Sequence, residues 1–389
     1  MRLLVLCESV GPEGGMERYL EIVLPVLDVR CATLRVLARR ITDDQASLDV
    51  QQIDWADEHA RPDAEAARAV RLQVQTFRPD VIIVHNVLDS GVMTEVRNVS
   101  RLVAHLHDHR VFCPNGDRLF PRAQHICTAR MGMACRVNTV MQGCMAGPRP
   151  ASFSLLDRRK ALRDSYFAAD AVVTASAYMA DEAIANGIDP ARMHILPYPL
   201  PDDAFNDAIA PRPDPTATVL FSARIAPQKG LRSLIDAISS IPRKRRPLLR
   251  IAGVGPDLES SRARAVARNV SCEVLGRLDR GAMRAAIDET SVVAVPSIWA
   301  EPFGYVGIEA LARGKPVAAY DVGGIKTWLD DGRNGYFAPV GDTAELAQAI
   351  ISLLDPVLHT DFSFSARASA ERYRLAPHIE RLEELYAAR

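Results

Sequence analysis

The sequence lacks long hydrophobic runs, an appreciable net charge and a recognisable secretion signal. In its 389 residues, no apolar stretch approaches the roughly 18–20 residues that a membrane-spanning helix needs. The apolar run at residues 3–7 is shorter than a signal-peptide core, and no small-residue cleavage site follows it. These absences predict a cytoplasmic protein without a membrane span.

Acidic and basic residues are almost balanced, with 48 Asp and Glu against 47 Lys and Arg and a formal net charge of −1. A protein whose main partner is a nucleic acid usually carries a basic surplus, so the composition argues against such a partner. Hydrophobic residues make up 48% and charged residues 24% of the chain, as in ordinary globular proteins. A chain of this length is expected to fold as two domains of about 150–200 residues each.

Short apolar runs alternate with segments of helical periodicity in the first half of the chain. Runs of this kind, bounded by polar residues or glycine, are typical of buried parallel strands. Strands that alternate with helices imply right-handed βαβ units and a parallel sheet covered on both faces. The predicted strands are residues 3–7, 81–85, 102–106 and 171–174, and the clearest helices are 16–27 and 64–76.

A proline-rich segment at 197–215 interrupts this alternation and is predicted to be a stiff linker. The predicted fold class is α/β, with two doubly wound Rossmann-like domains that face each other across a cleft. Their predicted bounds are 1–200 and 201–370, and an amphipathic helix within 371–389 is expected to pack back across the domain boundary. The strands predicted beyond the linker are 218–222, 248–253, 272–275, 291–296 and 317–320.

The strongest functional pattern is the stretch Glu301-Pro-Phe-Gly-Tyr-Val-Gly-Ile-Glu309, which follows a buried strand and enters a helix predicted from residue 306. Ligands of doubly wound sheets bind at the carboxyl ends of the strands, and the first N–H groups of a helix attract anions. Glu301 is placed to accept hydrogen bonds from sugar hydroxyls, and Glu309 from paired ribose hydroxyls. The amides expected to hold a diphosphate are those of Phe303, Gly304, Tyr305 and Val306.

This stretch resembles the E-x7-E signature of glycosyltransferase family four, whose members have the GT-B fold. Residues 221–230 resemble the family's Arg…Lys-Gly segment, and the resemblance assigns the holding of the donor diphosphate to Arg224 and Lys229. Fixed cations suit a leaving group that develops negative charge. Further segments similar to the family contribute Gly253, Arg277 and Leu278 to the donor site, the last two near the base.

Two elements of the first half also resemble the family. Gly14 and Gly15 lie in a loop similar to the family's Gly-Gly-x-Glu loop, whose backbone approaches the donor phosphates from the opposite domain. A side chain there would block that approach. His107, in the run His105-Leu-His-Asp-His109, matches a histidine that the family directs at the sugar and acceptor. Its alternative interpretation is a structural histidine with satisfied hydrogen bonds.

The resemblance covers nearly the whole chain and implies a retaining hexosyltransferase. The expected donor is a UDP- or GDP-sugar, and the expected acceptor is a hydroxyl of a glycan or lipid-linked molecule in surface polysaccharide, lipopolysaccharide or glycolipid biosynthesis. In the mechanism proposed for such enzymes, the leaving phosphate oxygen deprotonates the incoming hydroxyl, so neither a protein nucleophile nor a metal cofactor at the donor site is expected. The residues expected to be catalytic are His107, Arg224, Lys229 and Glu301.

Two other functions remain open, a nucleotide-sugar epimerase of the same fold and a degenerate transferase that only binds a partner. Taken singly, each motif also fits a structural role. A Gly-x-Gly is often a tight turn, an arginine a surface cation and a glutamate part of a solvated helix face. The order and spacing of the segments favours the transferase, because several roles then converge on one site.

An insertion at about 109–150 holds four of the seven cysteines, with the spacing Cys-x13-Cys-x7-Cys-x8-Cys. Zinc ligands usually occur in closer pairs. Three interpretations are open: unligated cysteines in a loop, a structural zinc or iron site, and disulfides, which a reducing cytosol disfavours. Because the insertion directly follows His107, it is expected to border the acceptor site. The candidate ligands are Cys113, Cys127, Cys135 and Cys144.

The segment 153–163 mixes apolar and basic residues at helical spacing. A basic amphipathic helix binds anionic lipid, and a lipid-linked acceptor would require peripheral contact with the inner membrane face. The alternative is a helix whose apolar stripe faces the protein core and whose charged side is solvated.

Overall fold

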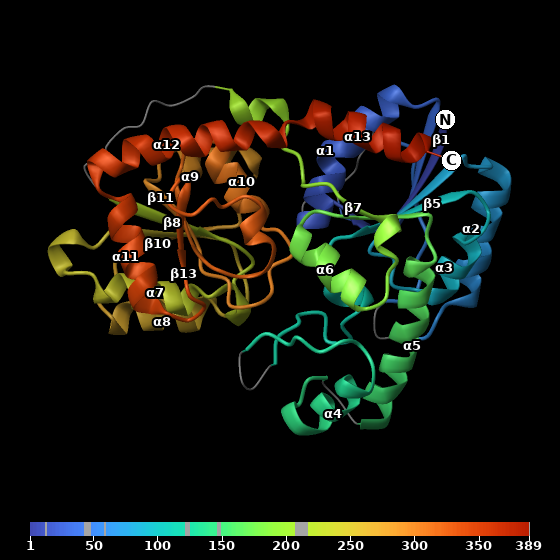
Figure 1. Ribbon diagram of the computed structural model, residues 1–389, viewed down its shortest axis with the longest axis horizontal. Coiled ribbons are helices and arrows are strands. Elements are labelled where there is room, and N and C mark those ends of the chain that lie inside the picture. The colour runs from blue at the N-terminus through green and yellow to red at the C-terminus, as the bar shows by residue number, and fades with distance from the viewer. Residues whose placement is uncertain are drawn as a thin grey trace. The chain divides into compact units, whose positions relative to one another are not determined.

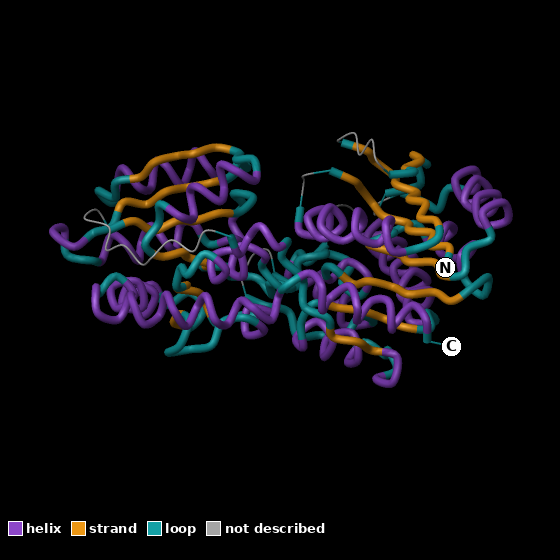
Figure 2. Tube along the Cα trace, turned by 90° about the horizontal axis from the view of Figure 1, so that it is seen from above, coloured by secondary structure: helices purple, strands orange, loops and turns teal. Residues whose placement is uncertain are grey.

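A computed structural model describes residues 1–11, 14–42, 48–57, 60–120, 125–145, 149–206 and 217–388. The chain divides into two compact units. The first consists of Met1–Pro199 together with Leu375–Arg389, and the second consists of Leu200–Arg374. Each unit is built on a parallel sheet with helices on both faces (Figure 1 and Figure 2). The predicted α/β class with two doubly wound domains is therefore confirmed.

The first unit contains a seven-stranded sheet in the order β3-β2-β1-β4-β5-β6-β7. The strand order reverses direction between β1 and β4, because β2 and β3 extend to one side and β4 to β7 to the other. The strands are β1 (Arg2–Val10), β2 (Thr33–Ile41), β3 (Val50–Gln52), β4 (Val81–His85), β5 (Arg101–Leu106), β6 (Ala171–Thr174) and β7 (Met193–Ile195). The helices are α1 (Gly15–Arg30), α2 (Ala64–Phe77), α3 (Ser90–Val96), α4 (Met133–Gln142), α5 (Arg149–Phe167) and α6 (Ala177–Ala185), with 3-10 turns η1 (His109–Val111) and η2 (Pro190–Arg192).

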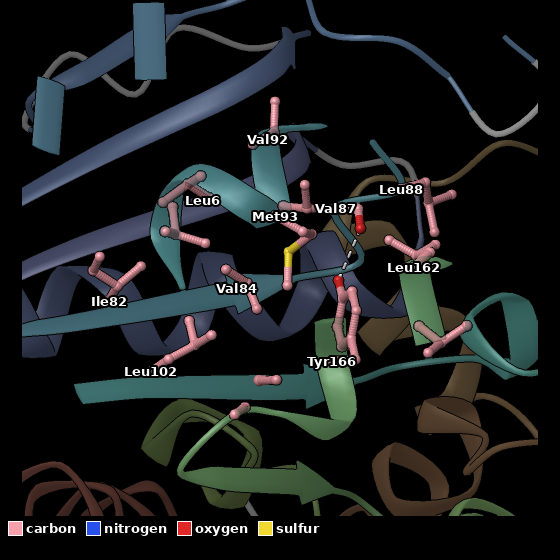
Figure 3. Close-up of a cluster of buried hydrophobic side chains, with 14 of the residues drawn as sticks. Leu6, Ile82, Val84, Val87, Leu88, Val92, Met93, Leu102, Leu162 and Tyr166 are labelled. Carbon is pink, nitrogen blue, oxygen red and sulfur yellow. Dashed lines mark hydrogen bonds between the residues drawn. The ribbon is translucent and has the colours of Figure 1, made fainter. Parts of the chain in front are cut away.

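Helices α3 and α5 cover one face of this sheet and bury its central strands (Figure 3). Every residue of β4 is buried, which explains why it is an unbroken apolar run in the sequence. The hydroxyl of Tyr166 on α5 donates a hydrogen bond of 3.0 Å to the carbonyl of Val87. The labelled core side chains are Leu6, Ile82, Val84, Val87, Leu88, Val92, Met93, Leu102, Leu162 and Tyr166.

The apolar residues of α5 pack inside the protein. Leu162 and Tyr166 belong to this core, and Leu156 belongs to a smaller buried group with Met131 and Met145. All three are at most 1% exposed, and none of the described side chains of α5 is a large exposed hydrophobic one. The core-facing interpretation of the segment 153–163 therefore accounts for its periodicity. None of the described helices is long and apolar enough to cross a membrane.

The last helix, α13 (Leu375–Ala387), belongs to the first unit. The imidazole of His378 links it to Tyr19 of α1, with 3.1 Å between Nε2 and the hydroxyl, and to the carbonyl of Pro197 at 3.0 Å from Nδ1. Arg101, at the start of β5, donates from Nε to the carbonyl of Leu385 at 3.1 Å. The chain therefore leaves the first unit after Pro199 and returns to it at Leu375.

The second unit contains a six-stranded sheet in the order β10-β9-β8-β11-β12-β13, which reverses direction between β8 and β11. The strands are β8 (Thr218–Ser222), β9 (Leu248–Ala252), β10 (Cys272–Gly276), β11 (Val292–Val295), β12 (Val317–Tyr320) and β13 (Gly335–Ala338). The helices are α7 (Leu231–Ser240), α8 (Leu258–Ala267), α9 (Arg280–Asp288), α10 (Tyr305–Ala312), α11 (Thr343–Leu353) and α12 (Pro356–Ala370). The shorter 3-10 turns are η3 (Asp202–Phe205), η4 (Pro227–Lys229), η5 (Arg243–Arg245), η6 (Gly323–Thr327) and η7 (Glu371–Tyr373).

All the strands expected from apolar runs are present, and β2, β3, β7 and β13 are additional. The proline-rich segment begins where the two units are divided, and its residues 207–216 lie outside the described part of the chain.

Candidate active site

Two loops meet at the carboxyl edge of the second sheet, where the strand order reverses between β8 and β11. Lys229 closes η4 in the loop after β8, and Glu301 follows β11. The two strands are paired in parallel, so both loops leave the sheet side by side. The Lys229 Nζ atom lies 2.8 Å from Glu301 Oε2. Two residues singled out 72 positions apart in the sequence thus form an ion pair.

The carboxylate of Glu301 is buried, with 7% of the residue exposed. Besides Lys229, Oε2 accepts hydrogen bonds from Ser297 Oγ at 3.0 Å and from Trp299 Nε1 at 2.9 Å. Burial by itself would raise the pKa of this carboxyl, but attraction to Lys229 and the three hydrogen bonds outweigh it and lower the pKa below its usual range. Glu301 is therefore ionised. All three donors bind Oε2, so Oε1 keeps its capacity to accept hydrogen bonds from a ligand.

The backbone around Glu301 is fixed by the loop after β12. Gly324 donates its N–H to the Glu301 carbonyl at 2.7 Å, and a Cβ on Gly323, whose φ is 56°, would lie 2.3 Å from that same oxygen. The indole of Trp328 donates to the carbonyl of Phe303 at 2.6 Å. These contacts hold the loop at the entrance of α10.

Helix α10 starts directly after this loop, with Gly304 as its N-cap in the left-handed conformation (φ 88°). No side chain caps the helix, so its positive end is not neutralised by a capping side chain. Tyr305 and Val306 are half-buried in its first turn, and Glu309 is half-buried one turn later. The order Glu301, helix N-terminus, Glu309 is the one expected from the sequence.

Arg224 lies at the end of β8 and is exposed, without a hydrogen-bond or ion-pair partner among the described residues. Its loop is held to the loop after β9, since Ile225 donates its N–H to the Val254 carbonyl at 2.9 Å. A Cβ on Gly253, whose φ is 129°, would lie 2.0 Å from the Ala223 carbonyl oxygen. The close packing of these two loops is enough to require glycine at 253.

Arg277 and Leu278 lie between β10 and α9, at the same edge of the sheet. Arg277 is exposed and Leu278 is half-buried. Gly253 donates its N–H to the carbonyl of Gly276 at 2.7 Å, which joins this loop to the loop after β9. The loops after β8, β9, β10 and β11 are thus connected within one unit, and each carries a residue assigned to the donor site from the sequence.

In the first unit, Gly14 and Gly15 lead from β1 into α1. Glu17 is hydrogen-bonded to Ser9 at the end of β1, and a Cβ on Gly14 would lie 2.7 Å from the Glu17 carboxylate. A Cβ on Gly15 would meet no atom of the described residues within 4 Å. The packing of the described part of the chain therefore does not explain why residue 15 is glycine.

His107 follows β5 and is buried, with 7% of the residue exposed. Its Nε2 shares a hydrogen bond of 2.8 Å with Nδ1 of His85, and its Nδ1 shares one of 2.6 Å with the hydroxyl of Tyr198. Burial lowers the pKa of His107 to about 3, so the ring is neutral at physiological pH. Both ring nitrogens have partners in the protein, as the structural interpretation of this residue requires.

His85, His105 and His107 form a buried group at the ends of β4 and β5. Among the described residues, this is the only group that brings three potential metal-binding atoms within 4.8 Å of one another. Two of the nitrogens already bond each other, and burial lowers the pKa of all three rings. His85 and Tyr198 were not predicted. His85 is the last residue of a predicted strand, and the adjacency of β4 and β5 brings it to His107.

The four cysteines of the insertion, Cys113, Cys127, Cys135 and Cys144, line one cavity in the first unit. All seven cysteines of the chain are free thiols, so the disulfide interpretation does not describe this structure. His109 packs against Phe112, and His125 packs against Phe120. Neither histidine lines the cavity.

Each of the two units matches a separate family of known proteins. Residues 202–367 match the family described as glycosyl transferases group 1, and residues 14–199 match the family described as glycosyl transferase 4-like domain. Similar proteins include a phosphatidyl-myo-inositol mannosyltransferase of Mycobacterium leprae, which is 35% identical over 176 residues (44% of this chain and 47% of that one). A glycogen synthase of Mycobacterium tuberculosis is 32% identical over 232 residues (54% of this chain and 51% of that one). The matches therefore span about half the length of these curated relatives.

Solved structures with the same fold cover nearly the whole chain. The crystal structure of Anabaena HepE in complex with UDP-glucose has a TM-score of 0.71 at 17% identity and covers 98% of each chain. That of WaaG, a glycosyltransferase involved in lipopolysaccharide biosynthesis, has a TM-score of 0.73 at 16% identity and covers 99% of this chain and 100% of that one. Together with the two family matches, these likenesses show that the chain belongs to the GT4-like glycosyltransferases of the GT-B fold.

Proposed function

We propose that the protein transfers a hexose from a UDP- or GDP-linked sugar to a hydroxyl of a glycan or lipid-linked acceptor, with retention of the anomeric configuration. The observation that carries the proposal is the Lys229–Glu301 pair beside exposed Arg224 at the strand reversal of the second sheet. Crevices at such reversals are where doubly wound sheets bind nucleotides.

Arg224, Lys229 and the N-terminus of α10 are the groups proposed to bind the donor diphosphate. Arg224 is exposed on a loop fixed by backbone hydrogen bonds, so little rearrangement is needed to pair it with phosphate. The uncapped helix end adds a positive dipole. As the glycosidic bond breaks, negative charge grows on the diphosphate and these groups stabilise it. Two cations and a helix terminus supply this role without a metal ion, so we expect Mg²⁺-independent turnover.

Glu301 is proposed to bind hydroxyls of the transferred sugar through Oε1. Its other oxygen is held by three donors, which fixes the orientation of the carboxylate. Fixed acceptors of this kind position a sugar with little loss of entropy on binding. Glu309 on α10 is proposed to accept hydrogen bonds from the ribose. Neither carboxylate is needed as a nucleophile, because the leaving phosphate oxygen deprotonates the acceptor hydroxyl.

His107 is proposed to position the ends of β4 and β5 in the first unit rather than to transfer a proton. It is neutral and hydrogen-bonded at both ring nitrogens. Gly15 is proposed to admit the donor phosphates to the backbone, since the chain itself leaves space at its Cβ position.

The acceptor is proposed to be a precursor of a surface polysaccharide, lipopolysaccharide or glycolipid. A mannosyltransferase named for phosphatidyl-myo-inositol is among the relatives, and WaaG, which is involved in lipopolysaccharide biosynthesis, has the same fold. A lipid-linked acceptor requires peripheral contact between a cytoplasmic enzyme and the inner membrane face.

The surface proposed for that contact is the outer face of α4. Residues 119–156 contain no acidic residue, and Arg130 is exposed, so the segment suits an anionic lipid surface. The spacing of the exposed apolar residues places them on one face of the helix. These residues are Met133 (70% exposed), Val137 (53%), Val140 (43%) and Met141 (68%).

A thermal-shift panel of UDP-, GDP- and ADP-sugars tests the donor proposal. We expect stabilisation by one hexose donor and by its free nucleoside diphosphate. Incubation of that donor with candidate glycan and lipid acceptors, with the product analysed by NMR, should then show an α-linkage from an α-linked donor. An epimerised nucleotide sugar would indicate the epimerase instead. No shift with any nucleotide would contradict the proposal.

A further inference from the structure

The insertion gathers four cysteines that are far apart in its sequence. Cys113 follows η1, Cys127 follows the isolated bridge between Leu119 and Ile126, Cys135 lies on α4, and Cys144 follows that helix. All four line one cavity, whose other walls are largely apolar. Residues that do not line the cavity lie between each cysteine and the next in the sequence. The tertiary fold of the insertion, and not one helix or strand, therefore brings the four cysteines together. The side chains completing the cavity include Phe112, Leu119, Ala129 and Met145.

A tight turn places Cys113 in the wall of this cavity. The turn Cys113-Pro-Asn-Gly is closed by the Gly116 N–H, which donates to the Cys113 carbonyl at 2.9 Å, and Gly116 has a φ of 84°. Pro114 and Asn115 of the same turn also line the cavity.

The spacing of the sulfurs distinguishes between metals. A single zinc ion with Zn–S bonds of about 2.3 Å holds its four sulfurs roughly 3.8 Å apart. Among the described residues, only the three histidines bring three ligand atoms within 4.8 Å of one another, so no three of these sulfurs do. The four cysteines line a cavity without forming the compact group of sulfurs that a single zinc ion needs. In an iron–sulfur cube each cysteine binds a different iron, so the four sulfurs lie farther apart.

We propose that Cys113, Cys127, Cys135 and Cys144 bind a [4Fe–4S] cluster. A preassembled cluster capped by thiolates of a carrier protein enters by ligand exchange. Each cysteine sulfur bonds to one iron and displaces one carrier thiolate, which takes up the proton of that cysteine, so no electrons are transferred. The guanidinium of Arg118, which is paired with Glu182 and hydrogen-bonded to the Ala129 carbonyl, lies in the cavity wall.

The cluster would serve as a structural crosslink. The buried apolar group that the insertion forms with α5 is small, consisting of Met131, Met145 and Leu156. A metal cluster compensates for a core of this size. The insertion begins two residues after His107, so the crosslink also anchors the chain that leaves the end of β5.

Elemental analysis of the full-length protein purified without oxygen tests this proposal, with iron, zinc and acid-labile sulfide measured on one sample. We expect about four iron and four sulfide per chain, with the broad visible absorption of a cluster. Stoichiometric zinc without sulfide would overturn it, as would metal-free protein with four titratable thiols or with disulfides.

Two serine substitutions provide the matched comparison. Cys135→Ser should lose most of the iron and sulfide and make the insertion sensitive to protease. Cys272→Ser, which removes a half-buried cysteine of the second unit, should keep both at wild-type levels. Full iron and sulfide in Cys135→Ser would remove Cys135 from the ligand set and contradict the four-cysteine site. The composition of the wild-type protein decides the proposal even if Cys135→Ser fails to fold.

Discussion

Lys229 and Glu301 form an ion pair of 2.8 Å whose side chains are only 19% and 10% exposed. A buried carboxylate that loses its counter-charge is left with an uncompensated desolvation cost. Lys229 therefore has a structural role in addition to its proposed contact with the donor, and its loss does not report on donor binding alone.

We expect Lys229→Met to destabilise the second unit by about 3 kcal/mol, because it leaves the Glu301 carboxylate buried without its cation. Urea unfolding measures this loss. The double variant Lys229→Met with Glu301→Gln should recover part of the stability, since it removes the buried charge as well. Equal stability of Lys229→Met and wild type would show that the pair contributes nothing to the fold.

Arg224→Ala isolates the contact with the diphosphate. Arg224 is exposed and has no partner within the described residues, so its removal should leave the unfolding midpoint unchanged. Donor affinity should fall at least about tenfold, the equivalent of roughly 1.4 kcal/mol for a lost charge-assisted contact. Isothermal titration with the donor measures this. Arg243→Ala removes another exposed arginine of the same unit, in η5, and should bind the donor like wild type. Wild-type affinity in Arg224→Ala would remove this residue from the donor site.

Gly15→Ala and Gly253→Ala test two different reasons for a glycine. At residue 15 the proposed reason is access for the ligand, and at residue 253 it is close packing against the backbone. A methyl group at residue 15 meets none of the described residues, so Gly15→Ala should keep its stability while donor binding weakens. At residue 253 the methyl group would lie 2.0 Å from a carbonyl oxygen, at a φ of 129°, so Gly253→Ala should lower the melting temperature. Thermal scans with and without donor compare the two. Undiminished donor binding in Gly15→Ala would refute the proposed approach of the phosphates.

The buried histidines should make the first unit sensitive to acid. Burial lowers the pKa of His107 to about 3 and that of His378 to about 4, and it lowers those of His85 and His105 as well. The unfolded chain takes up these protons near pH 6.5, so stability is full above that pH and is lost as the pH falls toward about 4. Each histidine contributes up to about 1.4 kcal/mol per pH unit.

Hydrogen exchange on β4 and β5, corrected for its intrinsic pH dependence, measures this loss. Protection should fall steeply as the pH drops from about 6.5 toward about 4, between the pKa of unfolded histidine and those of the buried rings. His378→Asn should show a shallower fall, and the exposed His125→Asn should follow wild type. Protection that does not change with pH would contradict the effect of the histidines.

The outer face of α4 should bind vesicles. Val137→Asp with Met141→Asp places two charges on the exposed apolar face and should abolish sedimentation with anionic liposomes at low salt. Leu72→Asp changes a residue of α2 that is 57% exposed and should leave sedimentation unchanged. Absence of wild-type protein from the liposome pellet would overturn the proposed membrane contact.

Strands buried on both faces are the part of the fold best predicted from the sequence. The bounds of β4, β6 and β12 agree with those predicted, because continuous burial produces an unbroken apolar run. Strand β2 was missed because three arginines interrupt it. Two of them are balanced in the folded state, Arg35 by Asp49 and Arg39 by Glu8, and the sequence pattern does not show these pairings.

The sequence motifs identified residues of the second-unit site but not the contacts between them. Lys229 and Glu301 stand out in the sequence, but their pairing depends on how two loops approach each other, as do the hydrogen bonds from Ser297 and Trp299. His107 was found at a strand end. Its partner Tyr198, 91 positions later, reaches it only through the tertiary fold, so the structural role of His107 could not be inferred from spacing.

The return of α13 to the first unit has a consequence for synthesis on the ribosome. The second unit lies between the two segments of the first, so its whole sheet is synthesised before α13. The first unit lacks the contacts of His378 and Leu385 until that helix has been made. Although domains usually complete folding in the order of their synthesis, the half that is translated first here depends on a helix that is translated after the whole second unit.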